Sequence, residues 1–145
     1  MRVVVDTNVL VSSFFGGPPR EVIERWKRGE ITLCVSRGLI EEYVEVLNRL
    51  GLQAELIQEL LELLASGYNL VFTGSTSPLQ VLKHDPDDNM LFECAVELEA
   101  KVIVTGDQAV RSVGRYMDVD VTTPTEFLAR YATDQRSLPQ ARAPR

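Results

Sequence analysis

The chain has 145 residues, of which 45% are hydrophobic, and a formal net charge of −6. This length fits one domain that can bury a core without disulfide staples. The acidic balance argues against a general nucleic-acid-binding protein, which is normally basic, but it leaves open an enzyme whose acidic residues surround a cation. We expect no signal peptide, because Asp6 and Asn8 interrupt the first apolar run, and no membrane span, because no apolar stretch is long enough to cross a bilayer.

Alternating segments organise the body of the chain. Strand-like runs lie near residues 2–5, 31–35, 69–72, 101–104 and 118–121, and helical patterns separate them. This alternation predicts an α/β fold, a three-layer α/β/α sandwich with a central parallel sheet of about five strands. We assign residues 1–132 to this domain. Residues 133–145 are rich in Pro, Arg and Gln without periodicity, and we predict a disordered tail there.

Local signals place the early helices. A short helix is expected over residues 8–15, ended by a turn at residues 16–19, and a second helix is expected over residues 20–28. Ser36 is a good N-cap for a helix over residues 37–50, and Gly51 closes that helix.

A further helix over residues 53–65 completes a helical hairpin with a wide apolar stripe. The stripe is formed by Leu56, Ile57, Leu60, Leu61, Leu63 and Leu64. Such a stripe is usually core, but it can also receive a partner or a second copy of the chain. A charge at Leu60 is expected to break that contact if the stripe is a docking surface.

Two acids follow two predicted strands. Asp6 ends the first strand, and Asp107 follows the fourth after Thr105 and Gly106. In open α/β sheets, ligands bind beyond the carboxyl ends of the strands, so these acids are candidate site residues. Each also has an ordinary structural interpretation, because Asp is common in turns and at helix N-caps.

Helical periodicity selects two further acids. Glu42 lies three residues after Leu39 and four before Val46, on the face that is predicted to be buried. Asp88 lines up with the apolar stripe of Leu91 and Ala95 in the next helix. The alternatives are a Glu that reaches solvent and an acid that simply favours a helix start.

The start of that later helix adds one more candidate. Asp85 is a good N-cap before Pro86, and it is also a possible outer contributor to an acidic site. His84, the single histidine, is best interpreted as a loop residue, and no motif supports a serine or cysteine nucleophile.

The inward-facing acids are expected to meet at one edge of the predicted sheet. Four independent helix caps would explain this joint pattern less well. The acids are Asp6, Glu42, Asp88 and Asp107. Like charges repel, so such a group usually needs a cation. The pattern therefore predicts a metal-dependent enzyme. Cys34 and Cys94 match no metal-ligand spacing, and we expect them to be buried thiols in a reducing cytoplasm.

In this order, the motifs resemble the PIN domain family. The matching segments are residues 4–10 (VVDTNVL), 35–47 with Glu42, 85–89 (DPDDN) with Asp88, 104–107 (VTGD) and the closing 121–128 (VTTPTEFL). The resemblance is closest to the toxin components of toxin–antitoxin pairs. One departure is residues 108–111 (QAVR), where family members often carry a hydrophobic Asp-Leu-Leu-like run.

The resemblance implies a compact endoribonuclease that hydrolyses RNA phosphodiester bonds with Mg²⁺ or Mn²⁺. The ion-binding and catalytic residues would be Asp6, Glu42, Asp88 and Asp107. Asn8 and Thr105 would orient water or carboxylates around them. The family also implies a homodimer and a small antitoxin protein as partners.

Two alternatives stay open at this level. One is a PIN-like binding or regulatory module whose site has lost its chemistry. The other is a phosphatase of the haloacid dehalogenase type with Asp6 as covalent nucleophile. The second scheme requires another acid two residues later, where this chain has Asn8.

Overall fold

A six-stranded sheet forms the centre of the computed structural model, which describes residues 1–51, 54–83 and 85–131. The strands are β1 (Arg2–Val5), β2 (Thr32–Ser36), β3 (Leu70–Thr73), β4 (Val102–Val104), β5 (Arg115–Tyr116) and β6 (Val119–Thr122). Their order is β3-β2-β1-β4-β6-β5. All neighbouring strands are parallel except β5 and β6.

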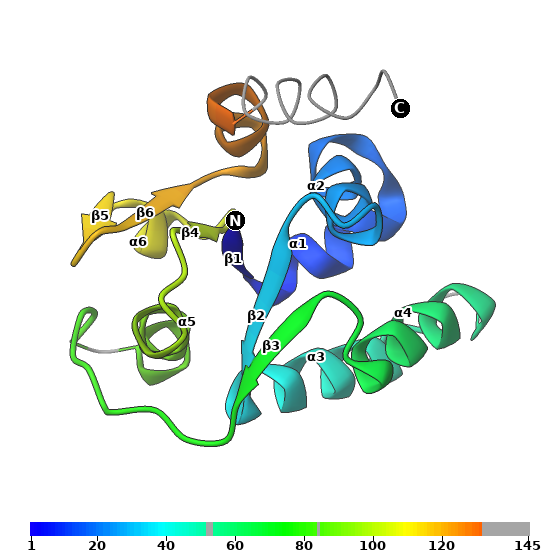
Figure 1. Cartoon of the computed structure of the whole chain (residues 1–145), viewed down its shortest axis with the longest axis horizontal. Coiled ribbons are helices and arrows are strands. Elements are labelled where there is room, and N and C mark those ends of the chain that lie inside the picture. The colour runs from blue at the N-terminus through cyan, green and yellow to red at the C-terminus, as the bar shows by residue number, and fades with distance from the viewer. Residues whose placement is uncertain (52–53, 84, 132–145) are drawn as a thin grey trace, which may run out of the picture.

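Helices cover both faces of this sheet. They are α1 (Thr7–Ser12), the 3₁₀ turn η1 (Ser13–Phe15), α2 (Gly17–Lys27), α3 (Arg37–Arg49), α4 (Ala54–Ser66), α5 (Pro86–Glu97), α6 (Gln108–Arg111) and a helical segment at 124–131. In Figure 1, α2 and segment 124–131 lie on one side of the sheet and α5 lies on the other. The α/β sandwich expected from the sequence is thus confirmed.

The register of the central strands brings two strand ends together. Val3, Val4 and Val5 of β1 pair with residues 102–104 of β4, and all six side chains are fully buried. Continuous apolar runs of this kind suit parallel strands that are covered on both faces. At the end of this pairing the amide of Asp6 donates to the carbonyl of Val104 at 2.9 Å. Asp6 therefore lies beside the segment that leads to Asp107.

Trp26 fastens α2 to the start of β3. Its side chain is fully buried, and its indole N–H lies 3.1 Å from the carbonyl oxygens of both Tyr68 and Asn69. The hydroxyl of Tyr68 donates in return to the carbonyl of Lys27 at 2.6 Å. A buried indole usually finds such a hydrogen-bond acceptor. The contact fixes the helices on this face against the edge of the sheet.

The second helix starts earlier than the sequence predicts. α2 begins at Gly17, so Pro18 and Pro19 lie in its first turn, where no backbone N–H is needed for an intrahelical bond. The turn lies at Gly16 and Gly17, whose φ angles of 96° and 73° favour glycine.

The two-residue strand β5 was not predicted. It joins β6 through Met117 and Asp118, which have positive φ angles of 46° and 69°. Two-residue hairpin turns of this kind are normally signalled by Asn-Gly or Asp-Gly, and this turn carries neither pair. Ion pairs from Arg115 to Asp118 (3.3 Å) and Asp120 (2.5 Å) support the hairpin instead.

The apolar stripe of α4 is divided between core and surface. Leu60 and Leu64 are buried, whereas Leu56 is 44% exposed. The expectation that a charge at Leu60 would test docking is therefore wrong, because such a charge would enter the core. Leu56 is the appropriate position for that test.

Three sequence-based expectations fall outside the described residues: the disordered tail at 133–145, the domain boundary at residue 132 and the loop position of His84. Within the described part of the chain, no helix combines the length and apolar character needed to cross a membrane.

We predict that Leu60→Ala and Leu56→Ala differ strongly in stability. Leu60→Ala should lower the free energy of unfolding by about 2–5 kcal/mol, because it leaves a cavity in the core. Leu56→Ala should change it by about 0.5 kcal/mol or less, as for most surface positions. Urea unfolding followed by circular dichroism measures both values. Equal losses would contradict the division of the stripe described above.

Candidate functional site

Asp6 lies at the end of β1 with 8% of its surface exposed. Its Oδ2 accepts a hydrogen bond from the Thr105 hydroxyl at 2.6 Å, and the Asn8 amide lies 3.4 Å from the same oxygen. Burial raises the pKa of Asp6, the bond from Thr105 opposes this, and the nearby carboxylates of Glu42 and Asp107 add to the increase. The charges of two other predicted acids, Glu42 and Asp107, therefore influence the pKa of Asp6.

Glu42 approaches from α3. Its Oε2 accepts a hydrogen bond from the hydroxyl of Thr7, which lies in the first turn of α1 and is buried. The next residue, Tyr43, is fully buried and donates its hydroxyl to the carbonyl of Val5, so α3 is fixed against the end of β1. Sequence reasoning gave no role to Thr7. Its position directly after Asp6 was the available signal.

Asp88 and Asp85 lie against each other at the start of α5. Asp85 occupies the N-cap position, but its side chain makes no capping bond. Burial, the neighbouring carboxyl group of Asp85 and the charges of Asp107 and Asp6 raise the pKa of Asp88 to about 7.

Asp107 has the structural role that its position after a strand suggested. Its Oδ1 accepts from the amides of Ala109 (2.8 Å) and Val110 (3.2 Å), which caps α6. Its own amide donates to the Thr105 hydroxyl at 3.0 Å. Thr105 thus bonds to Asp6 with its hydrogen and to the Asp107 backbone with its oxygen, linking the two strand ends.

Asn89 is a second residue whose role sequence reasoning missed. It is buried, and its side-chain amide forms two hydrogen bonds of 2.7 Å with the backbone N–H and C=O of Leu82. This pair of bonds fastens the loop before α5 to the helix that carries Asp88. The sequence signal for this role was the amide side chain of Asn89 within the acidic motif at residues 85–89.

The predicted acids face one another without basic partners. Within the described residues, no ion pair involves Asp6, Glu42, Asp88 or Asp107. Carboxylate oxygens that repel one another are suitable ligands for a hard divalent cation such as Mg²⁺ or Mn²⁺.

These acids do not form a complete ligand cluster. Among residues 1–51, 54–83 and 85–131, no three or more His, Cys, Asp and Glu side chains lie close enough together to hold a metal ion. The carboxylates act on one another through their charges instead. The carboxylate oxygens of these acids suit a divalent ion. Binding of such an ion would require the four acidic side chains to move closer together.

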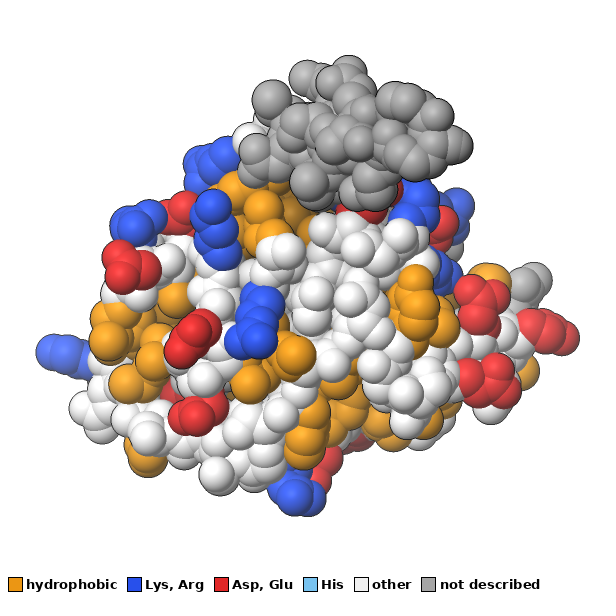
Figure 2. Space-filling view, viewed as in Figure 1, with side chains coloured by type: hydrophobic (Ala, Val, Ile, Leu, Met, Phe, Trp, Pro, Cys, Tyr) orange, Lys and Arg blue, Asp and Glu red, His pale blue; other side chains and the backbone are white. Residues whose placement is uncertain are grey.

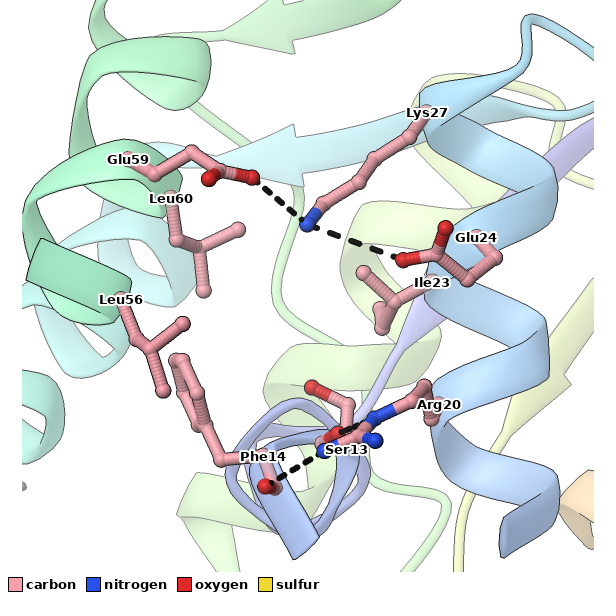
Figure 3. A pocket seen from close by; sticks show the side chains of 9 residues that line it. All are labelled: Ser13, Phe14, Arg20, Ile23, Glu24, Lys27, Leu56, Glu59 and Leu60. Carbon is pink, nitrogen blue, oxygen red and sulfur yellow. Dashed lines mark hydrogen bonds and ion pairs between the residues drawn. The ribbon is translucent and has the colours of Figure 1, made fainter. Parts of the chain in front are cut away.

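A separate cavity lies between α2 and α4. Its volume is about 420 Å³, and it contains none of the four acids. Figure 3 shows Leu56 and Leu60 facing Phe14 and Ile23 across it, with Lys27 bridging the two walls. Near its rim, Glu55, Glu59 and Glu62 on α4 are exposed, and Figure 2 shows acidic side chains gathered over this helix. On the face in Figure 2, basic side chains are scattered.

A comparison with known families gives one match. A family model described as PIN domain matches residues 2–109. The chain belongs to the PIN domain family. PIN domains are generally nucleases that use divalent metals, and the matched segment contains all four acids. The similarity at residues 121–128 lies beyond the match and stays a prediction. No curated protein matched the chain.

The proton held at Asp88 predicts how stability depends on pH. Its pKa is raised from 3.8 to about 7 in the folded chain, so its contribution to stability is complete below about pH 4 and is lost as pH rises through about 7. In EDTA, we expect the melting temperature to fall over this range, and to fall less steeply in Asp88→Asn. Mn²⁺ should raise the melting temperature more at the upper end. Parallel pH profiles for the two proteins would contradict the assignment.

Proposed function

We propose that this PIN domain is a metal-dependent endoribonuclease that hydrolyses RNA phosphodiester bonds. The mutual charge effects among Asp6, Glu42, Asp88 and Asp107, none of which forms an ion pair among the described residues, support this proposal most. Family membership supports the nuclease class.

In the proposed mechanism, the chain's residues hold and orient the acidic ligands. Asp6, Glu42, Asp88 and Asp107 would hold one or two Mg²⁺ or Mn²⁺ ions. Such an ion supplies Lewis acidity for the attack of water on phosphorus and for the departure of the leaving oxygen.

Hydroxyl groups set the orientation of two of these acids. Thr105 fixes Oδ2 of Asp6, and Thr7 fixes Oε2 of Glu42. Asn8 lies between Asp6 and the amide of Gly106, which is 3.4 Å from its Oδ1, and so presents its amide N–H toward Asp6. Hydrogen bonds of this kind limit how far a ligand can rotate.

We further propose that the protein is the toxin component of a toxin–antitoxin pair and acts in the cytoplasm. The resemblance of the ordered motifs to such toxins supports the first point. The cysteines are consistent with the second: Cys34 and Cys94 are buried and unpaired, and burial raises their pKa values to about 11 and about 12. Thiols of this kind are poor nucleophiles and oxidise slowly.

The decisive test is RNA cleavage by Asp6→Asn. This change keeps the size of the side chain but removes the most buried of the predicted carboxylates, so we expect cleavage to fall by about a hundredfold or more. A mixed panel of single-stranded and structured RNAs should be incubated with Mg²⁺, with Mn²⁺ and with EDTA. Cleavage should disappear in EDTA.

Asp118→Asn is the matched control. The Asp118 side chain is 98% exposed in the β5–β6 turn, and Asn tolerates its positive φ well. The Asp118→Asn protein should cleave RNA at the wild-type rate. Full activity in Asp6→Asn, or in EDTA, would contradict the proposal. Binding of Mn²⁺ without turnover on any RNA would favour the silent binding module, a candidate consistent with the incomplete ligand cluster.

We propose that the chain forms a homodimer through α4 and is silenced by an antitoxin protein. Leu56 and Phe15 are 44% and 71% exposed, so apolar surface remains near the cavity between α2 and α4. Leu56→Glu should shift the mass measured by light scattering from dimer to monomer while the melting temperature changes little. An unchanged mass, or a monomeric wild type, would contradict this contact.

A further inference from the structure

The strand β3 forms one edge of the sheet, and no described strand pairs with its outer side. Figure 1 shows β3 at the front of the sheet, with no helix drawn across it. An edge strand normally carries a charge, a proline or a bulge that prevents another chain from pairing with it. The sequence of β3 is Leu-Val-Phe-Thr, its register with β2 is continuous, and Phe72 is 51% exposed. This edge therefore lacks the usual protection.

The register of β3 determines which of its backbone groups are unpaired. The amide of Leu33 in β2 donates to the carbonyl of Asn69 at 3.0 Å, and Leu33 pairs with Leu70. In a parallel ladder, alternate residues direct their N–H and C=O groups to the same neighbour. Residues 69, 71 and 73 therefore face β2, and residues 70 and 72 face outward. Within the described part of the chain, the backbone groups of Leu70 and Phe72 have no other hydrogen-bond partner.

Charged residues are absent from the sequence around this edge. Residues 63–82 contain no Asp, Glu, Lys or Arg, although 25% of the whole chain is charged. Two copies of the chain, each with a net charge of −6, repel each other in most orientations. Contact through β3 places none of these charges in the strand pairing itself. The edge is therefore suited to a second copy of this chain.

The unpaired groups of β3 are complementary to themselves. Leu70 and Phe72 lie on either side of Val71, so a two-fold axis at Val71 places Leu70 opposite Phe72 of a second copy. In this antiparallel arrangement, each such pair of residues exchanges both of its N–H···O=C bonds. All the outward groups of Leu70 and Phe72 are then satisfied in both copies.

The same arrangement also covers apolar surface. Leu70 and Phe72 project to one face of β3, because side chains alternate along a strand. Opposite Leu70 of the second copy, the exposed ring of Phe72 loses contact with water. Apolar cross-strand pairs at this spacing stabilise antiparallel strands.

We propose that two copies of this chain pair through their β3 strands, antiparallel about a two-fold axis at Val71. The two sheets then continue as one across the contact. Symmetric contacts, in which the same surface meets itself, are the commonest in soluble oligomers. Because the paired segment is short, the contact forms only at high protein concentration. It is separate from the α4 contact proposed above and requires neither RNA nor a metal ion.

The mass of the Leu56→Glu protein over a range of concentrations tests this pairing, because that protein lacks the α4 contact. Measured by sedimentation equilibrium, its mass should rise from that of a monomer toward twice that value between about 10 µM and about 1 mM. Adding Phe72→Pro should keep it monomeric, because proline removes the outward N–H. Edge strands tolerate a proline whose N–H position faces solvent, so the melting temperature should change little.

Phe72→Lys is a second variant, and it keeps the backbone N–H. It places a charge in the pairing and should also prevent the rise in mass. Met117→Lys is the matched control, since Met117 is 64% exposed in the β5–β6 turn at the other edge of the sheet and the change adds the same charge. In the Leu56→Glu background, the Met117→Lys protein should associate as strongly as Leu56→Glu alone.

A cysteine at the proposed axis tests the register. Val71→Cys should form an intermolecular disulfide with oxidised glutathione at high protein concentration, because residue 71 faces residue 71 of the second copy in a close pair. Thr73→Cys should not, because residue 73 faces residue 69. Cys34 and Cys94 are buried, so the wild type should form no cross-link.

Two results would overturn the β3 contact. One is a mass of the Leu56→Glu protein that stays constant with concentration, which would leave this edge to a strand of another protein. The other is a rise in mass that persists in both Phe72 variants. Cross-linking through residue 73 but not through residue 71 would overturn the two-fold axis at Val71. The mass of the wild type in dilute solution reports on α4 alone, so the two contacts are tested independently.

Discussion

The parallel pairing of β1 with β4 is the constraint on which the candidate site depends. It places Asp6 beside the turn that carries Asp107, and one hydroxyl, that of Thr105, then joins the two segments. Because residues 3–5 and 102–104 are fully buried, a shift of register would expose valines and bury polar ends at the same time. The hydrophobic core therefore fixes the separation of the two strand-end acids.

Helices bring the other acids to this edge at an electrostatic cost. Burial and mutual repulsion raise the pKa values of Asp6 and Asp88, because both effects disfavour the charged carboxylates. Thr7 and Thr105 offset part of that cost with hydrogen bonds to Glu42 and Asp6. Folding thus gathers the carboxylates, and a divalent cation would relieve the repulsion that remains.

Much of this arrangement followed from the sequence, since strand ends and helical periodicity are local signals. Periodicity placed Glu42 and Asp88 on the inner faces of their helices, and both are half-buried there. The Thr7–Glu42 bond joins segments 35 residues apart, and no local pattern reports it. The turn at Met117 and Asp118 escaped prediction because its residues lack the usual turn chemistry.

The short strand β5 also affects how the molecule meets its neighbours. An exposed sheet edge is a template on which another chain can pair and start an aggregate. Here β6 is covered by an antiparallel strand of only two residues, with the charged Arg115 on it. So short and charged an edge offers little backbone for further pairing. The β5–β6 hairpin, which the sequence did not predict, thus limits edge-to-edge association on that side of the sheet.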